Sequence, residues 1–283
     1  MLNIGIIGNG FVGKATYLLK CEHVNMFSYD INPELCIPKG IALSDICRCD
    51  IIFISVPTPM NEDGSCNTSI IESVVNSIKK CVDLNEKIVV IRSTIPVGVS
   101  DKLNCYFMPE FLTEKNYMSD FINNEEWIFG IKNTDQDLIF EKLIIQLIDT
   151  SYEYGKIKSN KITFVSNKEA EMVKLFKNTF LATKVSFCNE IYKYCEKKNI
   201  NYDNVKELVG NDSRIGNSHL SVPGHDGLFG YGGTCFPKDI HNLYSEMKKE
   251  NIDSYILKSV IERNELVDRS SKDWLNDKGR VIM

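Results

Sequence analysis

Residues 2–13 read LNIGIIGNGFVG, an apolar run that passes directly into the pattern G-x-G-x-x-G. The run Leu2–Ile7 predicts a buried strand, and the residues after the glycines, Lys14–Lys20, predict a helix. Glycines between a strand and a helix allow a tight turn, the approach of a pyrophosphate and close packing of the helix. The stretch therefore predicts a dinucleotide-binding turn, with N–H groups at the start of the helix facing the phosphates. The residues expected to line it are Gly8, Asn9, Gly10, Phe11, Val12 and Gly13.

An acidic residue follows at the distance that such a turn requires. A second strand is predicted at Val24–Tyr29, and it ends in Asp30. A carboxylate about 20 residues beyond the glycines binds the ribose 2′-hydroxyl and repels a 2′-phosphate. Asp30 therefore predicts NAD rather than NADP as the cofactor.

The rest of the N-terminal half alternates strands with helices. Apolar runs predict further strands, and segments with helical spacing predict the helices between them. This alternation predicts a doubly wound, mostly parallel sheet of Rossmann type with right-handed crossovers. The expected strands are 50–56, 87–91, 106–108, 127–132 and 161–165, and the expected helices are 68–82, 97–103 and 136–148.

The pattern changes after residue 166. From Asn167 to about Lys198 the chain has neither glycine nor proline, which predicts one helix of roughly 30 residues, well above the usual length. The expected fold is an α/β domain over residues 1–166, followed by an all-α domain over residues 167–283 built on this long helix. The later part is expected to contain helices at 202–209, 237–250 and 253–267 and a polar loop at 212–228.

Composition limits the kinds of partner. The chain has 283 residues, enough for about two domains, and a net charge of −5, which argues against a nucleic-acid partner. No apolar run approaches the roughly 18 residues of a membrane span, and the N-terminus opens into a strand pattern rather than a signal peptide. The ten cysteines are irregularly spaced, and the close pair Cys47 and Cys49 lacks the second pair or histidine cluster of a zinc site. We expect reduced thiols, no metal, no membrane contact and a cytoplasmic protein.

A second glycine-rich stretch, FGYGGTCFPKD at residues 229–239, surrounds a single cysteine. Pro237 suits the first turn of a helix, so Cys235 is expected at or just before the helix N-terminus. The positive end of the helix dipole and the charge of Lys238 favour a thiolate there, and Asp239 lies about one turn away. The stretch fits either a nucleophilic cysteine in a glycine-walled pocket or a buried cysteine beside an ordinary turn.

Two side chains of the long helix are spaced to face one site. Lys174 and Asn178 lie four residues apart, so they share a helix face. Held against apolar neighbours such as Leu175 and Phe176, the lysine would act electrostatically. A solvated lysine is the alternative.

Polar side chains also follow several of the predicted strands. Thr58 and Thr94 stand just after strand ends, where ligands bind in such sheets. Thr94 could equally cap the helix that begins at Val97. Glu110 and Glu114 flank an apolar pair, and on a helix start they would share a face and act as bases. Otherwise they form a solvated acidic turn.

Taken in order, these segments resemble the UDP-glucose 6-dehydrogenase family, within the wider UDP-glucose/GDP-mannose dehydrogenases. The resemblance extends along essentially the whole chain, and the cysteine stretch is its most specific part. The matching segments are Gly8–Gly13, Val56–Pro59, Ser93–Gly98, Pro109–Glu114, Glu169–Glu190, Arg214–Gly216 and Phe229–Asp239.

The resemblance implies a two-step oxidation of a sugar 6-hydroxyl to a carboxylate with two NAD⁺. Cys235 would attack the intermediate aldehyde, and the resulting thiohemiacetal would be oxidised to a thioester that water hydrolyses. Lys174 with Asn178 would stabilise the oxyanions. Asp239 would hold a water beside the thiol, and Thr94 would position that water or the alcohol.

The resemblance also implies which residues face each ligand. Glu110 would be the base for thioester hydrolysis. Glu114, Thr58 and Lys238 would contact NAD. The residues implied for the sugar site are Glu110, Phe111, Leu112, Thr113, Glu114, Lys174, Asn178, Arg214, Tyr231 and Gly232.

For the assembly, the resemblance implies a homodimer through the long helix, with Arg214 reaching the partner's site. Family members usually continue into a third domain that helps to hold UDP. This sequence stops at Met283, about where that domain would begin, so we expect either a naturally short form or a truncated one. UDP-glucose is the expected substrate. The alternatives are the same chemistry on GDP-mannose or a UDP-N-acetylhexosamine, a two-electron β-hydroxyacid dehydrogenase, and a non-catalytic NAD-binding protein. Residues 222–227 lengthen one loop relative to some members, and Arg92 replaces the usual lysine, which we treat as minor.

Overall fold

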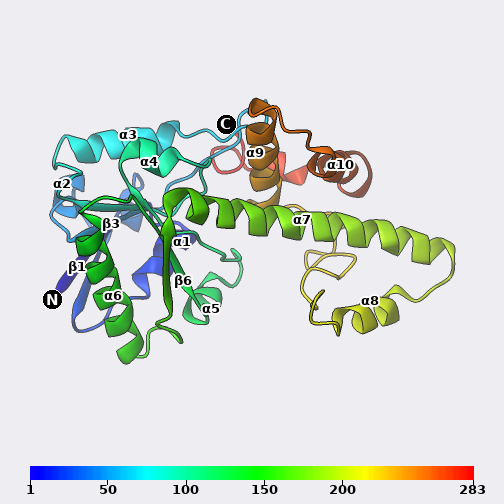
Figure 1. Ribbon diagram of the computed structural model, residues 1–283, viewed down its shortest axis with the longest axis horizontal. Coiled ribbons are helices and arrows are strands. Elements are labelled where there is room, and N and C mark those ends of the chain that lie inside the picture. Colours follow the sequence, from blue (N-terminus) through cyan, green and yellow to red (C-terminus); the bar gives the residue numbers. More distant parts are fainter. The chain divides into compact units, whose positions relative to one another are not determined.

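A computed structural model describes residues 1–283 and divides them into two compact units. The first unit comprises Met1–Thr58 and Thr68–Lys174, and the second comprises Pro59–Asn67 and Leu175–Met283. The first is an α/β unit and the second is mainly helical, so the predicted fold class is confirmed (Figure 1). The domain boundary expected after residue 166 coincides with the junction of a strand and the long helix, and it stays a prediction.

The α/β unit contains one seven-stranded sheet in the order β2-β1-β3-β4-β5-β6-β7. Neighbouring strands from β2 to β5 are parallel, β6 runs antiparallel to β5, and β7 is parallel to β6. The sheet is therefore mostly parallel, as predicted, but its last two strands are reversed. The strands are β1 (Leu2–Ile7), β2 (Val24–Tyr29), β3 (Ile51–Ile54), β4 (Ile88–Ile91), β5 (Tyr106–Phe107), β6 (Trp127–Ile131) and β7 (Ile162–Ser166).

Helices cover both faces of this sheet, which is why its central strands are apolar throughout (Figure 1). One apolar core lies between the sheet and α1, α5 and α6, where Phe140 and Phe121 are buried. The other lies between the sheet and α2, α3 and α4, around Ile71 and Val75. These helices are α1 (Phe11–Tyr17), α2 (Leu43–Ile46), α3 (Ser69–Lys79), α4 (Val99–Leu103), α5 (Tyr117–Ile122) and α6 (Asp137–Glu153).

The reversal of β6 and β7 sets the path of the long helix α7 (Asn167–Lys197). Because β7 is reversed, α7 starts at the sheet edge where β1–β5 begin, and Asn167 donates to the C=O of Cys105, just before β5. A Cβ on Gly130 of β6 would lie 2.5 Å from Oδ1 of Asn167, so the helix passes directly over this glycine. Seven residues, about 10 Å of helix, then bring Lys174 to the segment that follows β5.

The second unit combines the rest of α7 with three further helices around two small apolar cores. One core includes Ala182, Ile240 and Val260, and the other includes Cys188 and Tyr202. The helices are α8 (Tyr202–Gly210), α9 (Phe236–Lys249) and α10 (Tyr255–Arg263). One helix was expected over residues 253–267. The structure instead has α10, which ends at Arg263, followed by a π-helical turn at Asn264–Asp268.

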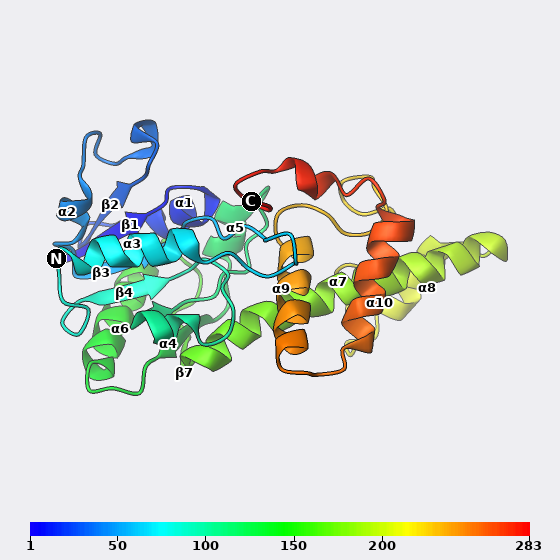
Figure 2. The ribbon, with the colours of Figure 1, turned by 90° about the horizontal axis from the view of Figure 1, so that it is seen from above.

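A loop from the N-terminal half also belongs to this unit. The N–H of Met60 donates to the C=O of Val281 over 2.6 Å, and Met283 donates back to Met60 over 3.2 Å. Figure 2 shows this C-terminal segment, in red, beside the loop that follows β3. The loop Pro59–Asn67 is therefore held by backbone pairing to the C-terminal residues.

The cysteines form no disulfide. Several are deeply buried: burial raises the pKa of Cys49 to about 11 and that of Cys105 to about 12. None of the helices has both the length and the apolar composition needed to span a membrane.

Candidate active site

The glycine fingerprint combines two closely packed positions with one open position. A Cβ on Gly8, where φ is +91°, would lie 2.5 Å from the C=O oxygen of Ser55, and one on Gly13 would lie 2.1 Å from that of Gly8. A Cβ on Gly10 would meet no atom within 4 Å. Gly8 and Gly13 therefore serve packing, whereas Gly10 leaves the space that an approaching pyrophosphate needs. The helix starts at Phe11 rather than at the predicted Lys14, so Gly13 lies within its first turn.

Asp30 is attached to this fingerprint by hydrogen bonds. Its carboxylate accepts from the N–H of Asn9 over 2.7 Å and from that of Asn32 over 2.8 Å. The side chain of Asn9 is buried, donates to the C=O of Leu35, and has an Oδ1 without a partner. The open position at Gly10, the orphaned Oδ1 of Asn9 and the fixed carboxylate fit a dinucleotide with a free 2′-hydroxyl.

Hydroxyl groups gather where β3 and β4 end. Thr58 donates to the C=O of Thr94 over 2.8 Å, and Ser93 donates to the C=O of Val56 over 2.6 Å. The helix after them, α4, has Gly98 as its N-cap, without a side-chain cap. Helix capping by Thr94, one of the two roles considered from the sequence, is therefore wrong.

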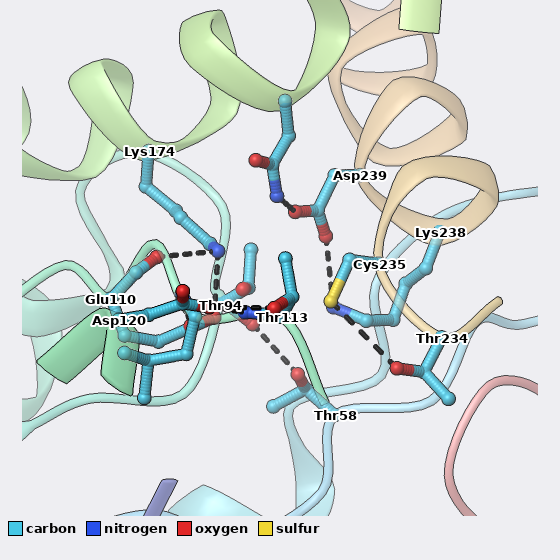
Figure 3. A network of polar contacts seen from close by, with 12 residues as sticks. Thr58, Thr94, Glu110, Thr113, Asp120, Lys174, Thr234, Cys235, Lys238 and Asp239 are labelled. Carbon is cyan, nitrogen blue, oxygen red and sulfur yellow. Dashed lines mark hydrogen bonds and ion pairs between the residues drawn. The ribbon is translucent and has the colours of Figure 1, made fainter. Parts of the chain in front are cut away.

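A buried ion pair joins the segment after β5 to α7. Lys174 Nζ donates to Oε1 of Glu110 and to its C=O, each over 2.6 Å, and the N–H of Leu112 donates to Oε2 over 2.9 Å. The two charged side chains are only 3% and 5% exposed. Figure 3 shows Lys174 and Glu110 facing one another. Lys174 Nζ also lies 5.7 Å from the ring centroid of Phe111.

Two local expectations about these residues were wrong. Residues 109–113 form no helix, so Glu110 and Glu114 do not share a helix face. Lys174 is held by a carboxylate rather than by apolar neighbours, and Phe176, which we expected beside it, is 59% exposed. Lys174 can be buried because it pairs with Glu110. Glu110 lies 64 residues away in sequence, so helix periodicity could not predict this contact.

Arg92, which we treated as a minor replacement in the sequence, lines the same cavity as Glu110. It follows β4 directly, is buried, and donates through Nη1 to Oγ1 of Thr16 in α1. Burial lowers the pKa of Arg92 to about 10, although the nearby charge of Glu110 opposes this shift. Its Nε has no partner, and the side chain lines a cavity of about 30 Å³ together with Glu110 and Asn124. The Glu110 carboxylate thus interacts with two cations, Lys174 by direct contact and Arg92 through its charge. The signal available in the sequence was an arginine directly after a buried strand.

The cysteine stretch folds as expected. Cys235 is the N-cap of α9, Pro237 lies in its first turn, and Oγ1 of Thr234 is 3.7 Å from Sγ of Cys235. Sγ therefore lies at the positive end of α9, where a thiolate is stabilised (Figure 3).

A polar network extends from this cysteine along α9. Asp239 accepts from Nζ of Lys238 over 2.9 Å and from Nδ2 of Asn178 over 2.6 Å. Burial alone would lower the pKa of Lys238, but the charge of Asp239, aided by Cys66 and Cys235, raises it above its usual value. A permanent positive charge therefore accompanies the sulfur, which favours its anionic form.

The remaining predicted residues differ in their settings. Lys174 and Asn178 lie one turn apart on α7, so both side chains leave the helix on one side. Tyr231 is buried, and Gly232 lies against the guanidinium of a buried arginine. Arg214 is exposed and paired with Asp212 through Nη2, 2.5 Å from Oδ2. The structure brings Arg214 to none of the other predicted site residues.

Comparison with known proteins yields matches along most of the chain. Residues 41–148 match the NAD-binding domain of the UDP-glucose/GDP-mannose dehydrogenase family, and residues 168–266 match its central domain. UDP-glucose 6-dehydrogenase of Rickettsia prowazekii is 32% identical over 228 residues, which are 77% of this chain and 49% of the relative. A putative UDP-glucose 6-dehydrogenase of Bacillus subtilis is 29% identical, over 92% of this chain and 58% of the relative. The chain spans about half the length of the curated relatives it matches.

Solved structures have the same fold. A UDP-glucose dehydrogenase from Pyrobaculum islandicum superposes with a TM-score of 0.79 at 23% identity, over 94% of this chain and 68% of that one. The 3-hydroxyisobutyrate dehydrogenase of Mycobacterium tuberculosis reaches 0.67 at 12% identity, over 100% of this chain and 96% of that one. At these identities the likeness establishes the architecture alone.

Proposed function

The chain belongs to the UDP-glucose/GDP-mannose dehydrogenase family, and on that premise we propose that it oxidises the C6 hydroxyl of a nucleotide sugar to a carboxylate. UDP-glucose, giving UDP-glucuronate, is the proposed substrate. The observation that carries the proposal is Cys235 at the N-terminus of α9, accompanied by Lys238 and by the Asp239–Asn178 pair. A two-electron alcohol dehydrogenase has no use for such a nucleophile.

The first unit supplies the cofactor site in this proposal. Gly8–Gly13 and Asp30 hold NAD, which accepts a hydride in each of the two oxidations. Thr58, Glu114 and Lys238 contact the cofactor, and Thr94 positions the alcohol or a water.

The covalent steps are assigned to the cysteine network. The Cys235 thiolate adds to the carbonyl carbon of the aldehyde, and the oxyanion of the thiohemiacetal takes up a proton. Loss of that proton and of a hydride leaves a thioester, which water cleaves to the carboxylate and the free thiol. Lys174 and Asn178, one turn apart on α7, stabilise each oxyanion, and Asp239 holds the water that relays protons.

Glu110 is assigned as the base that activates the hydrolytic water. Its two oxygens already accept from Lys174 and from the N–H of Leu112, which fixes the carboxylate. The loop of residues 111–114, together with Tyr231 and Gly232, is proposed to line the sugar.

We also propose a homodimer formed through α7. Four large apolar side chains project from this helix with exposures of 59–64%. Their spacing of four, seven and seven residues places them in one stripe along the helix. The stripe consists of Phe176, Phe180, Phe187 and Tyr194. In such a dimer, Arg214 is proposed to reach the partner's sugar site. The ten cysteines are irregularly spaced, as expected of reduced thiols, and on that pattern we propose the cytoplasm as the location.

The test is to measure the NADH formed per sugar with UDP-glucose, GDP-mannose and UDP-N-acetylhexosamines. We expect two NADH per UDP-glucose, and at most one with Cys235→Ser, because the thioester cannot form. If another nucleotide sugar yields two NADH and UDP-glucose does not, that other sugar is the substrate. Unimpaired turnover by Cys235→Ser would favour a two-electron β-hydroxyacid dehydrogenase, and NAD binding without turnover on any sugar would favour a non-catalytic protein.

A further inference from the structure

The glycine-rich loop that precedes Cys235 is held by two buried asparagines from other parts of the second unit. Oδ1 of Asn189, in α7, accepts from the N–H of Gly230 over 3.1 Å. Asn264 binds both backbone groups of Tyr231: its Oδ1 accepts from the N–H and its Nδ2 donates to the C=O, each over 2.9 Å. The two asparagines are 1% and 0% exposed, so these bonds are shielded from water. The Asn264 side chain thus makes the same pair of hydrogen bonds to Tyr231 that the backbone of a neighbouring strand would make.

The loop glycine is fitted to this asparagine. Gly230 has a φ of +67°, and a Cβ at this position would lie 2.3 Å from Oδ1 of Asn264. Any side chain here would push the carboxamide away from Tyr231. Gly230 therefore meets two needs, a left-handed backbone and the space for the Asn264 amide.

The backbone around Asn264 is itself unusual. The residue opens the π-helical turn after α10, and its C=O accepts from the N–H of Arg269, five residues later, over 2.7 Å. Such turns occur often at functional sites. Arg269 continues the support, because its guanidinium lies against Gly232 and binds Asp226 and Asp273.

We propose that Asn264 is a positioning residue for the nucleophile. By fixing Tyr231, four residues before Cys235, it holds Sγ at the N-terminus of α9 and within the field of Lys238. Without this clamp the loop relaxes and the thiolate loses part of its stabilisation. The role given to Cys235 rests on the proposed function, but its reactivity is measurable without any substrate.

The first experiment measures the rate at which iodoacetamide alkylates Cys235, followed by peptide mass spectrometry between pH 5 and 10. In Asn264→Ala we expect the rate at pH 7 to fall by about 10- to 100-fold, the size of effect that ångström-scale misplacement causes. The pH midpoint should rise, because the thiolate is less stabilised. An unchanged rate and midpoint in folded Asn264→Ala would overturn the proposal.

A matched variant separates positioning from general destabilisation. Asn167 in the first unit is also 0% exposed and donates two side-chain hydrogen bonds, to Asp101 and to the C=O of Cys105. Asn167→Ala should lower the melting temperature comparably while leaving the alkylation profile of Cys235 unchanged. If Asn167→Ala shifts this profile as much as Asn264→Ala does, the effect is structural and the proposal is wrong.

A second pair of variants breaks the clamp from the loop side. Gly155 has a φ of +66° with no atom within 4 Å of a built Cβ, so Gly155→Ala introduces backbone strain alone. Gly230→Ala adds the collision with Asn264 and should slow alkylation, which Gly155→Ala should not. Effects of Gly230→Ala and Asn264→Ala should be less than additive, because both remove one contact. Full additivity contradicts the proposal.

The exposed Cys81 provides an internal reference that tells two kinds of failure apart. If wild-type Cys235 reacts no faster than Cys81, the nucleophile assigned under the proposed function is wrong. If Cys235 reacts faster and Asn264→Ala does not change it, the nucleophile stands and the positioning role is wrong.

Discussion

Glu110 illustrates how a single buried carboxylate organises its surroundings. Lys174 pairs with it directly, and its charge also acts on the buried Arg92. Removing two such charges from water is expensive, and only close pairing with further hydrogen bonds offsets that cost. Glu110 has both, since the N–H of Leu112 binds its other oxygen. The ion pair therefore depends on the presence of both partners.

This dependence leads to a prediction for stability. Glu110→Gln leaves Lys174 buried without a counter-charge and should lower the unfolding free energy by about 3–5 kcal/mol. The double variant Glu110→Gln with Lys174→Met should recover much of this loss, because no lone charge remains buried. Urea denaturation of both variants and of Lys174→Met alone completes the cycle. Equal losses in Glu110→Gln and in the double variant would refute the buried-charge explanation.

His241 provides a pH-dependent element within α9. Its Nε2 lies 3.0 Å from Oε1 of Glu265, and its ring lies against Gly64. Burial lowers the pKa of His241, although the charge of Glu265 opposes the shift and that of Lys272 adds to it. The folded protein therefore takes up this proton at a lower pH than the unfolded chain.

The sign of the effect follows from that difference. The contribution of neutral His241 is complete above the unfolded pKa of about 6.5 and is lost as pH falls from there through the lowered folded value. The melting temperature of His241→Gln should therefore decline less between pH 7 and pH 5 than that of the wild type. The exposed His225, changed to Gln, is the control and should retain the wild-type slope. A parallel decline in all three proteins would rule out His241 as the source.

At the scale of the element, the turn between β1 and α1 separates packing from ligand contact. Gly13 is closed by the backbone of Gly8, whereas Gly10 faces open space with an ordinary φ of −68°. Substitution by alanine should therefore disturb packing at Gly13 and ligand binding at Gly10.

The predicted outcome is a crossed pattern. Gly13→Ala should cost about 1–3 kcal/mol of stability through overpacking. Gly10→Ala should change stability by less than about 0.5 kcal/mol, yet weaken NAD binding by about tenfold or more, equivalent to 1.4 kcal/mol. Thermal unfolding and calorimetric titration with NAD measure the two quantities. If Gly10→Ala binds NAD as the wild type does, the pyrophosphate does not pass this position.

The sequence predicted the regular elements well because local signals determine them. The predicted bounds of β1 and β2 match the structure to the residue, and the absence of glycine and proline located the end of α7 within one residue. Proline and the glycines placed Cys235 at a helix N-terminus. What remained hidden depends on contacts between distant segments. The reversal of β6, the Glu110–Lys174 pair and the clamp by Asn264 have no periodic signal in the chain.

For the whole molecule, the exposed stripe on α7 is the feature with consequences. A stripe of four aromatic side chains on one helix is unusual for a face in contact with water. In the proposed homodimer this stripe is covered by its symmetry mate, since a two-fold interface uses one surface twice.

The corresponding prediction concerns oligomeric state. The double variant Phe180→Glu with Phe187→Glu should be monomeric by light scattering, whereas the wild type should be dimeric. Leu138→Glu, at a 75% exposed position on α6, is the control and should stay dimeric. A wild type that is monomeric at every concentration would exclude the dimer.

Mixing Arg214→Ala with Cys235→Ser should restore some turnover if Arg214 reaches the partner's site.

The reversal of β6 also has a practical consequence for engineering. Since β6 runs opposite to β5, the loop after β6 opens at the sheet edge away from the carboxyl ends of β1–β5, where the fingerprint lies. Its tip, Asn133–Asp135, is exposed, a setting in which inserted sequences are tolerated. A fluorescent reporter or purification tag spliced in there would leave the dinucleotide turn unobstructed.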